Sequence, residues 1–387
     1  MNSKKIVLNE ISYFGSGARN ILCDEIKKKG FKKAFVITDR DLIKTNVIKM
    51  VTKILDDINF PYEAFSEVKQ NPTIDNVKNG VDAFFKSGAD CIVVIGGGSS
   101  IDTAKAVGII TKNPGFSDVR SLEGKEKTLK RSTPIFAFPT TAGTAAEVTI
   151  NYVITDEEKR KKMVCVDPNS IPIVSIIDPE LMISMPPGLT AATGMDALTH
   201  AIEGYITKDA WIMTDMFELK AIELIHAHLE NAVKNPSDMN AREGMALAQY
   251  IAGMGFSNVG LGIVHSMAHP LGAFYDIPHG VANAVLLPYV MEFNSQNCRE
   301  KFKAIGHAMG VVEINNLPMN DAIHATIDSV RKLSMVIGIP QKLKEVGVKE
   351  DDLDELAFEA FNDICTSGNP REVSTLDILG IYKNAFK

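Results

Sequence analysis

Short apolar runs alternate with amphipathic segments through the first half of the chain, and this alternation limits the possible folds more than any other feature. The segments between the runs, such as 42–58 and 74–87, place apolar residues at helical spacing. The runs are short and nearly all apolar, which is typical of strands buried on both faces of a parallel sheet. The pattern predicts a doubly wound, Rossmann-like α/β domain. The runs are KAFVIT (33–38), CIVVIG (91–96), PIFAFP (134–139) and IPIVSIID (171–178).

One segment of this half reads as antiparallel. TINYVITD (149–156) and KMVCVDP (162–168) flank the charged turn EEKRK. Two alternating runs joined by a short polar turn are typical of a β-hairpin. We therefore expect a hairpin that projects from the parallel sheet.

The hydrophobic pattern of the sequence changes after MPPG (185–188). Residues 189–387 carry long helical patterns and no comparable strand runs. A chain of 387 residues also exceeds the roughly 250–300 residues that one core usually fills. We expect an α/β domain over residues 1–185 and an all-α domain over residues 186–387.

Charge and composition argue against several classes of partner. The net charge of −7 gives no basic field for nucleic acid. The apolar stretch VANAVLLPYV is too short to span a bilayer, and MNSKKIVLNE lacks the apolar segment of a secretion signal. The five cysteines are scattered and form no C-x-x-C motif. We expect a cytoplasmic protein that binds neither nucleic acid nor membrane.

A glycine-rich turn stands between a strand and a helix at residues 91–110, CIVVIGGGSSIDTAKAVGII. Gly97 and Gly98 let the backbone approach a ligand closely, and the start of the helix favours an anion. Ser99 and Ser100 are expected N-caps. Ile101 excludes the G-x-G-x-x-G fingerprint, and the letters do not match a P-loop. The turn predicts a phosphate site, with a tight turn that binds no ligand as the alternative.

Two further polar positions follow predicted strands. Asp39 ends the run KAFVIT, where a carboxylate can accept from the hydroxyls of an adenine ribose and repel a 2′-phosphate. The alternative is a turn or helix cap. Thr140, Thr141 and Thr144 offer small donors in FPTTAGTAAEVT. Their alternative is ordinary capping of a helix that begins near Ala145.

A cluster of histidines and one carboxylate in the second half suggests a metal site. Asp196 and His200 are four residues apart, which places them on one helix face with Cβ atoms about 6 Å apart. His265, His269 and His279 lie within fifteen residues. Three imidazoles and a carboxylate suit a first-row divalent ion better than calcium or magnesium. Spacing alone leaves open whether His265 or His269 joins His279.

The metal site and the phosphate site together indicate a reaction. A divalent ion lowers the pKa of a hydroxyl that it binds, and in reverse it polarises a carbonyl. A nicotinamide accepts or gives the hydride. The combination predicts an alcohol dehydrogenase.

Four long motifs, in the correct order, resemble the iron-containing (group III) alcohol dehydrogenases, and the resemblance covers essentially the whole chain. The resemblance implies two domains with NAD and the metal in the cleft between them. It implies Fe(II) as the ion, with zinc as the alternative. It also implies a homodimer in which the strand near Lys5–Leu8 pairs across the two-fold axis. The motifs are GGGSSIDTAK, PTTAGTAAEVT, MDALTHAIEGY and HSMAHPLGAFYDIPHG.

The resemblance also implies roles for individual residues. It favours Asp196, His200, His265 and His279 as metal ligands. Asp196, His269 and His279 then become the catalytic residues, with His269 beside the metal as a proton relay or a substrate-orienting group. Phe256 and Cys365 resemble positions that line the substrate pocket. The implied cofactor-binding residues are Asp39, Asn71, Gly97, Gly98, Ser99, Asp102, Thr140, Thr141, Thr144, Asn151 and Lys162.

The resulting functional hypothesis is an NAD- and iron-dependent alcohol dehydrogenase. It would reversibly reduce small aldehydes such as lactaldehyde, the product there being 1,2-propanediol. The alternative within the family is a dehydrogenase of 1,3-propanediol, ethanol or butanol-type primary alcohols. Zinc glycerol dehydrogenases and dehydroquinate synthase share the implied architecture with different sites, and a nucleotide-binding scaffold is the non-enzymatic alternative.

Overall fold

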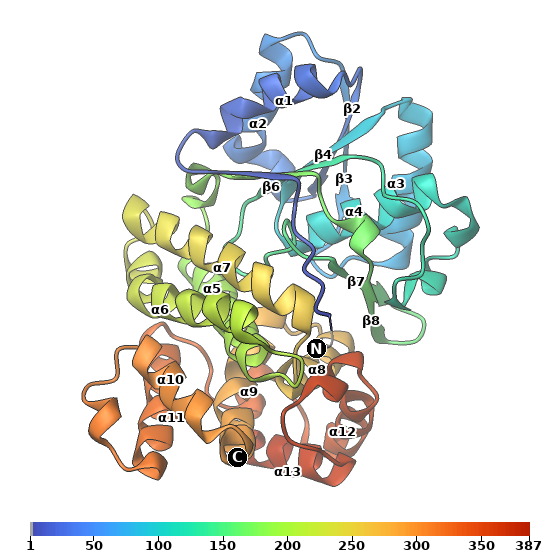
Figure 1. The fold of residues 1–387 in the computed structure, drawn as a ribbon. Coiled ribbons are helices and arrows are strands. Elements are labelled where there is room, and N and C mark those ends of the chain that lie inside the picture. Colours follow the sequence, from blue (N-terminus) through green and yellow to red (C-terminus); the bar gives the residue numbers. More distant parts are fainter. Residues whose placement is uncertain (1–2) are drawn as a thin grey trace. The chain divides into compact units, whose positions relative to one another are not determined.

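The computed structural model describes residues 3–387, which form two compact units (Figure 1). The first, the α/β unit, comprises the chain up to Thr141 together with Ala145–Ser184. The second, the helical unit, comprises Ala142–Thr144 together with Met185–Lys387. The segment 142–144 therefore belongs to the helical unit although the α/β unit precedes and follows it.

The α/β unit is built on a six-stranded sheet in the described part of the chain, with strand order β1-β9-β6-β4-β2-β3. Every strand pair of this sheet is parallel, as the apolar runs predict. Its strands are β1 (Ile11–Phe14), β2 (Ala34–Asp39), β3 (Tyr62–Val68), β4 (Cys91–Gly96), β6 (Ile135–Pro139) and β9 (Val174–Ile177).

Helices cover this sheet because its central strands are apolar on both faces. All six residues of β4 are buried, and alternate side chains enter two separate apolar clusters. Ile92 and Val94 pack in the cluster that includes α3 (Ile74–Ser87) and α4 (Gly98–Lys112). Val93 and Ile95 pack in the cluster that includes α1 (Leu22–Lys29) and α2 (Asn46–Asp57). The doubly wound arrangement is confirmed.

The predicted hairpin is present but belongs to a sheet of its own. β7 (Asn151–Asp156) and β8 (Lys161–Val166) pair antiparallel around the charged turn. The two-residue strand β5 (Gly124–Lys125) pairs parallel with β8 and completes a three-stranded sheet, order β5-β8-β7. The expectation that the hairpin projects from the main sheet is therefore wrong.

Two local expectations around the turns are also wrong. No helix begins near Ala145, because Ala145 has a φ of 52° in the left-handed region and the following residues form a turn. Ser99 and Ser100 are not N-caps, because α4 begins at Gly98 and its N-cap is Gly97, which offers no side chain.

The helical unit contains no strand within the described residues 185–387, as expected. α5, α6 and α7 pack against one another, and α9 packs against α5 and α8. No single helix in the described chain is long and apolar enough to cross a membrane, although α7 and α8, bent by 101°, pass the same test as a pair. The helices are α5 (Pro187–Ile206), α6 (Ile212–Lys234), α7 (Met239–Val259), α8 (Ile263–Tyr275), α9 (His279–Asn294), α10 (Arg299–Ala308), α11 (Met319–Val336), α12 (Leu353–Phe361) and α13 (Thr375–Phe386).

Candidate functional site

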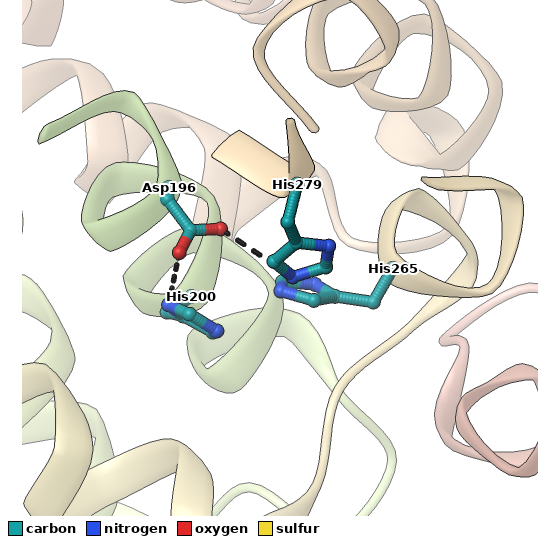
Figure 2. Close-up of side chains that lie close together, drawn as sticks. All are labelled: Asp196, His200, His265 and His279. Carbon is teal, nitrogen blue, oxygen red and sulfur yellow. Dashed lines mark ion pairs between the residues drawn. The ribbon is translucent and has the colours of Figure 1, made fainter. Parts of the chain in front are cut away.

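Four of the predicted ligands converge within the helical unit. Asp196 and His200 lie one turn apart on α5, His265 lies in the first turn of α8, and His279 is the first residue of α9. Each offers one ligand atom, and these atoms all lie within 4.8 Å of one another. Figure 2 shows the four side chains facing a common point. Spacing left His265 and His269 as alternatives, and His265 is the one in this cluster.

Burial sets the protonation of the imidazoles in this cluster. Burial lowers the pKa of His265 to about 3, against the opposing effect of the Asp196 carboxylate. Burial likewise lowers the pKa of His200 to about 4. Both rings are therefore neutral at pH 7, and each keeps a lone pair for a ligand.

Asn283, which the sequence reasoning missed, marks the point where the lone pairs meet. Its amide nitrogen lies 2.7 Å from Asp196 Oδ1 and 3.2 Å from the Nε2 atoms of both His265 and His279. One donor group thus faces three acceptor atoms on three helices. A set of acceptors that converge on one donor is also a set that can surround a cation.

The donor set fits a first-row divalent ion. One carboxylate and three imidazoles are ligands that iron, zinc and related ions accept, whereas calcium and magnesium prefer more oxygen ligands. Asp196 is buried and approaches two rings, with Oδ2 3.9 Å from His200 Nδ1 and Oδ1 3.7 Å from His279 Nε2. The structure is compatible with an ion bound by Asp196, His200, His265 and His279.

A second group of side chains borders this cluster. His269 Nδ1 lies 2.7 Å from Asp363 Oδ2, and its ring stacks on that of His279 with centroids 5.5 Å apart. Cys365 lies beside the same pair, with its backbone N–H donating to Asp363 Oδ1 at 2.8 Å. Asp363 thus fixes the orientation of His269 and leaves the Nε2 atom of the ring for another partner.

Phe256 borders the cluster from α7. Its ring stacks on His200 with centroids 4.1 Å apart and an angle of 9° between the planes. Phe256 therefore covers one face of a predicted ligand with apolar surface. Phe256, His269 and Cys365 all lie within the helical unit and adjoin members of the ligand cluster or one another.

The predicted phosphate turn lies in the α/β unit at the carboxyl end of β4. A Cβ at Gly96 would clash with Ser100, and one at Gly97 would come within 3.0 Å of Thr141 Oγ1. Only glycine fits at Gly96. Because the N-cap residue Gly97 has no side chain to cap α4, the backbone N–H groups of the first turn can serve a bound anion. The Ser99 hydroxyl donates to the Gln70 carbonyl.

Asp39 ends β2, beside that turn. Its two carboxylate oxygens allow both the predicted contact with a ribose and the alternative role, a turn cap. Its Oδ1 atom accepts from the N–H of Asp41 at 3.0 Å and of Leu42 at 2.7 Å, so it does cap the following turn. Its Oδ2 atom would lie 3.9 Å from a Cβ at Gly96. One carboxylate oxygen is thus used locally while the other faces the glycine turn.

Other predicted cofactor residues have partners inside the α/β unit. Lys162 Nζ donates to Asn71 Oδ1 at 3.0 Å, so the two predicted residues pair with each other. Asp102 accepts from the N–H of Val153 at 2.9 Å, which ties α4 to β7. Asn151 is the first residue of β7.

Lys105, on α4, is fully buried within the α/β unit. Its Nζ donates to Thr149 O at 2.7 Å, Thr149 Oγ1 at 3.0 Å and Asn151 O at 2.7 Å. Burial lowers its pKa, and the Asp102 carboxylate opposes that effect. Lys105 therefore holds the chain that enters β7 against α4.

The predicted threonines divide between the two units. Thr140 donates its backbone N–H to Gly96 O at 3.1 Å, and Thr141 lies against Gly97, both in the α/β unit. Thr144 belongs to the helical unit. There the backbone of Gly143 hydrogen-bonds the ring of His200, and a Cβ at Gly143 would come within 3.0 Å of Thr193 on α5.

Residues missed from the sequence fall into two kinds. Glu203 follows Asp196 and His200 by seven and three residues on the same face of α5, and Asn283 follows His279 by four on α9. Helical spacing could have found both. Asp363 is the N-cap of the short 3-10 helix Ile364–Gly368, which contains Cys365, and no local pattern connects it to His269.

Comparisons with known proteins agree with this geometry. Family models described as "Iron-containing alcohol dehydrogenase" and "Fe-containing alcohol dehydrogenase family, C-terminal" match residues 9–179 and 190–386. The lactaldehyde reductase of Escherichia coli K12 is 53% identical over 384 residues, which cover 99% of this chain and 100% of that protein. The NAD-dependent methanol dehydrogenase of Bacillus methanolicus is 41% identical, with 97% of each chain covered.

Solved structures agree as well. A crystal structure of 1,3-propanediol oxidoreductase superimposes with a TM-score of 0.96 at 42% identity, with 100% of both chains covered. The fold, the order of the motifs and the sequence identity over nearly the full length lead to one conclusion. The chain belongs to the iron-containing alcohol dehydrogenase family and is an oxidoreductase of that family.

Proposed function

We propose that this protein is an NAD- and iron-dependent alcohol dehydrogenase that reversibly reduces lactaldehyde and related small aldehydes, with 1,2-propanediol as the product from lactaldehyde. The observation that carries the proposal is the set of one carboxylate and three imidazoles around a common point, in which the rings of His200 and His265 are buried and neutral. The substrate class rests on the 53% identity to a lactaldehyde reductase over nearly the whole chain.

The residues that would hold the ion are Asp196, His200, His265 and His279. When bound, a divalent ion supplies a Lewis acid that polarises the aldehyde oxygen, and NADH supplies the hydride. His269, oriented by Asp363 through its Nδ1 atom, presents Nε2 as the group that gives the reduced oxygen its proton. In the oxidation direction the same atom takes that proton away.

The α/β unit would bind the dinucleotide. The open start of α4 beside Gly97, Gly98 and Ser99 suits the pyrophosphate, and Asp39 suits the adenine ribose. We assign the remaining contacts to the other predicted cofactor residues. They are Asn71, Asp102, Thr140, Thr141, Asn151 and Lys162 of the α/β unit, and Thr144 of the helical unit.

Phe256 and Cys365 would line the substrate pocket. Phe256 stacks on the predicted ligand His200, and Cys365 adjoins His269, whose ring stacks on the predicted ligand His279. An apolar ring and a thiol at this place favour a small aldehyde with a short carbon chain. We further propose a homodimer, and a cytoplasmic location because the reaction draws on the cellular NADH pool.

Anaerobic kinetics test the proposal. Protein loaded with Fe(II) should oxidise NADH with lactaldehyde, and the specificity constant kcat/KM should be highest for lactaldehyde in a panel with 3-hydroxypropanal, acetaldehyde, butanal and formaldehyde. A higher value for 3-hydroxypropanal would instead favour the 1,3-propanediol activity named for the solved relative. No NADH oxidation with any of these aldehydes would refute the proposed function.

A further inference from the structure

Glu203 is a buried carboxylate beside the predicted metal ligands, and no role was predicted for it from the sequence. It lies on α5 one turn after His200, and its side chain is 1% exposed. One oxygen accepts from the N–H of Val264 at 2.7 Å, and the other lies 2.6 Å from His265 Nδ1. The N–H of His265 reaches the same carboxylate at 3.4 Å.

All the groups around this carboxylate are donors. The backbone N–H groups of Gly262, Val264 and His265 belong to the start of α8, where no side chain of α8 provides a cap. The ring nitrogen of His265 faces the carboxylate as well. An ionised carboxylate only accepts, so it satisfies every one of these donors, whereas a protonated carboxyl would turn an O–H toward one of them.

The local backbone is shaped for this contact. A Cβ at Gly262 would come within 2.8 Å of Glu203 Oε1, so a larger residue there would displace the carboxylate. Glu203 thus caps α8 from a neighbouring helix, with its negative charge at the positive end of the helix. The cap also fixes the backbone of the residue that carries the predicted ligand.

The contact with His265 determines which ring nitrogen is free. Because the carboxylate accepts at Nδ1, that nitrogen carries the proton, and Nε2 keeps its lone pair. His265 Nε2 is the atom that lies 3.2 Å from the amide nitrogen of Asn283, at the centre of the cluster. A carboxylate behind an imidazole also raises the basicity of the ring as a metal ligand.

We propose that Glu203 is a positioning residue for the metal: its carboxylate accepts from His265 Nδ1 and so holds the ring with Nε2 toward the ion. This inference rests on the proposed metal site but not on the reaction or its substrate. A capping role alone would stabilise the start of α8 and leave metal affinity unchanged.

Glu203→Gln separates the two roles, because glutamine keeps one acceptor oxygen for the cap and loses the charge. Glu218→Gln is the matched control. Glu218 is also fully buried, on α6, and burial raises its pKa well above the usual value. The probe is Zn(II) alone, with its affinity for the metal-free full chain measured by competition with a chromophoric chelator.

We expect Glu203→Gln to weaken Zn(II) binding by about 10- to 100-fold, the usual effect of removing a carboxylate behind a metal-bound imidazole. Glu218→Gln should bind Zn(II) as the original chain does. The absorption bands of bound Co(II) should also shift in Glu203→Gln. Unchanged affinity and unchanged bands in Glu203→Gln, with a lower thermal unfolding temperature, would overturn the proposal in favour of simple capping.

A double-mutant cycle tests whether Glu203 acts through His265. In a His265→Ala background, the Glu203→Gln change should cost little further affinity. An equal loss in both backgrounds would mean that the charge acts on the ion without His265, and would overturn the positioning role. If the original chain and Glu218→Gln both fail to bind Zn(II), the proposed metal site itself fails, whatever Glu203 does.

Discussion

Replacing Asp39 should change the choice between NADH and NADPH. The carboxylate has two separable functions in the structure, because Oδ1 caps the turn at Asp41 and Leu42 while Oδ2 faces Gly96. Asp39→Asn keeps an acceptor oxygen for the cap and removes the charge. Asp39→Gly removes both. The pair of variants therefore separates electrostatic repulsion from loss of the local turn.

The expected magnitude follows from the charge that a 2′-phosphate would bring near Oδ2. Two like charges about 4 Å apart repel by roughly 1 kcal/mol in water and by about 4 kcal/mol at an effective dielectric constant near 20. Asp39 is only half-buried, so solvent screens part of this repulsion. We expect an effect of about 1.4–2.8 kcal/mol, or roughly 10- to 100-fold in the ratio of kcat/KM for NADPH and NADH.

The assay measures kcat/KM for both cofactors with lactaldehyde, together with the unfolding midpoint in urea. Asp39→Asn should raise the NADPH/NADH ratio with little loss of stability. Asp39→Gly should raise the ratio similarly but also lose about 1 kcal/mol of stability, since two backbone N–H groups lose their acceptor. A ratio unchanged in both variants would refute the assignment of Asp39 to the ribose.

Three further perturbations have defined outcomes. His265→Ala combined with His279→Ala should remove bound metal and activity while the circular dichroism spectrum stays helical, with exposed His324→Ala as the control; retained metal would contradict the ligand assignment. Lys105→Met should lower the free energy of unfolding by about 3–5 kcal/mol, because it leaves Asp102 and the carbonyls of Thr149 and Asn151 without the buried ammonium. A loss below about 1 kcal/mol, measured by urea unfolding, would contradict this prediction. Glu218→Gln should become increasingly stabilising as the pH rises above 4.5. Burial raises the pKa of Glu218, so the folded chain keeps a proton that the unfolded chain loses, and the advantage should grow by up to about 1.4 kcal/mol per pH unit in urea unfolding between pH 5 and pH 8. A difference in unfolding free energy between the variant and the original chain that stays constant with pH would contradict this prediction.

Local sequence patterns predicted several buried strands of the α/β unit. β4 and most of β2 consist of apolar residues, so their burial between two layers of helices could be predicted from the sequence. The order of strands in the sheet could not, because it depends on which apolar faces meet. The two-residue strand β5, which joins the hairpin in a three-stranded sheet, is too short to give a pattern.

The wrong expectations have physical reasons. Thr144 is followed by AAEVT, which has good helix formers, yet Ala145 takes a left-handed φ where the chain passes from one unit back to the other. Ser99 and Ser100 resemble caps, but the extended backbone of Gly97 lets α4 begin earlier. In both cases tertiary packing overrides local preference.

The candidate metal site was predictable in part. Helical spacing placed Asp196 and His200 together, whereas the choice of His265 over His269 needed either the resemblance or the structure. Asp363 is 94 residues from its partner His269, so its role depends on the tertiary fold. Asp363 was therefore harder to find from the sequence than Glu203 or Asn283, which lie at helical spacing from predicted ligands.

Titration of metal-free protein with Fe(II) under anaerobic conditions tests the central claim most directly, with bound iron and lactaldehyde-dependent NADH oxidation measured on the same samples. The account predicts that activity is absent without metal, rises in proportion to bound iron, and reaches its plateau at one ion per chain. Full activity without any bound metal, or a plateau unrelated to iron content, would contradict it.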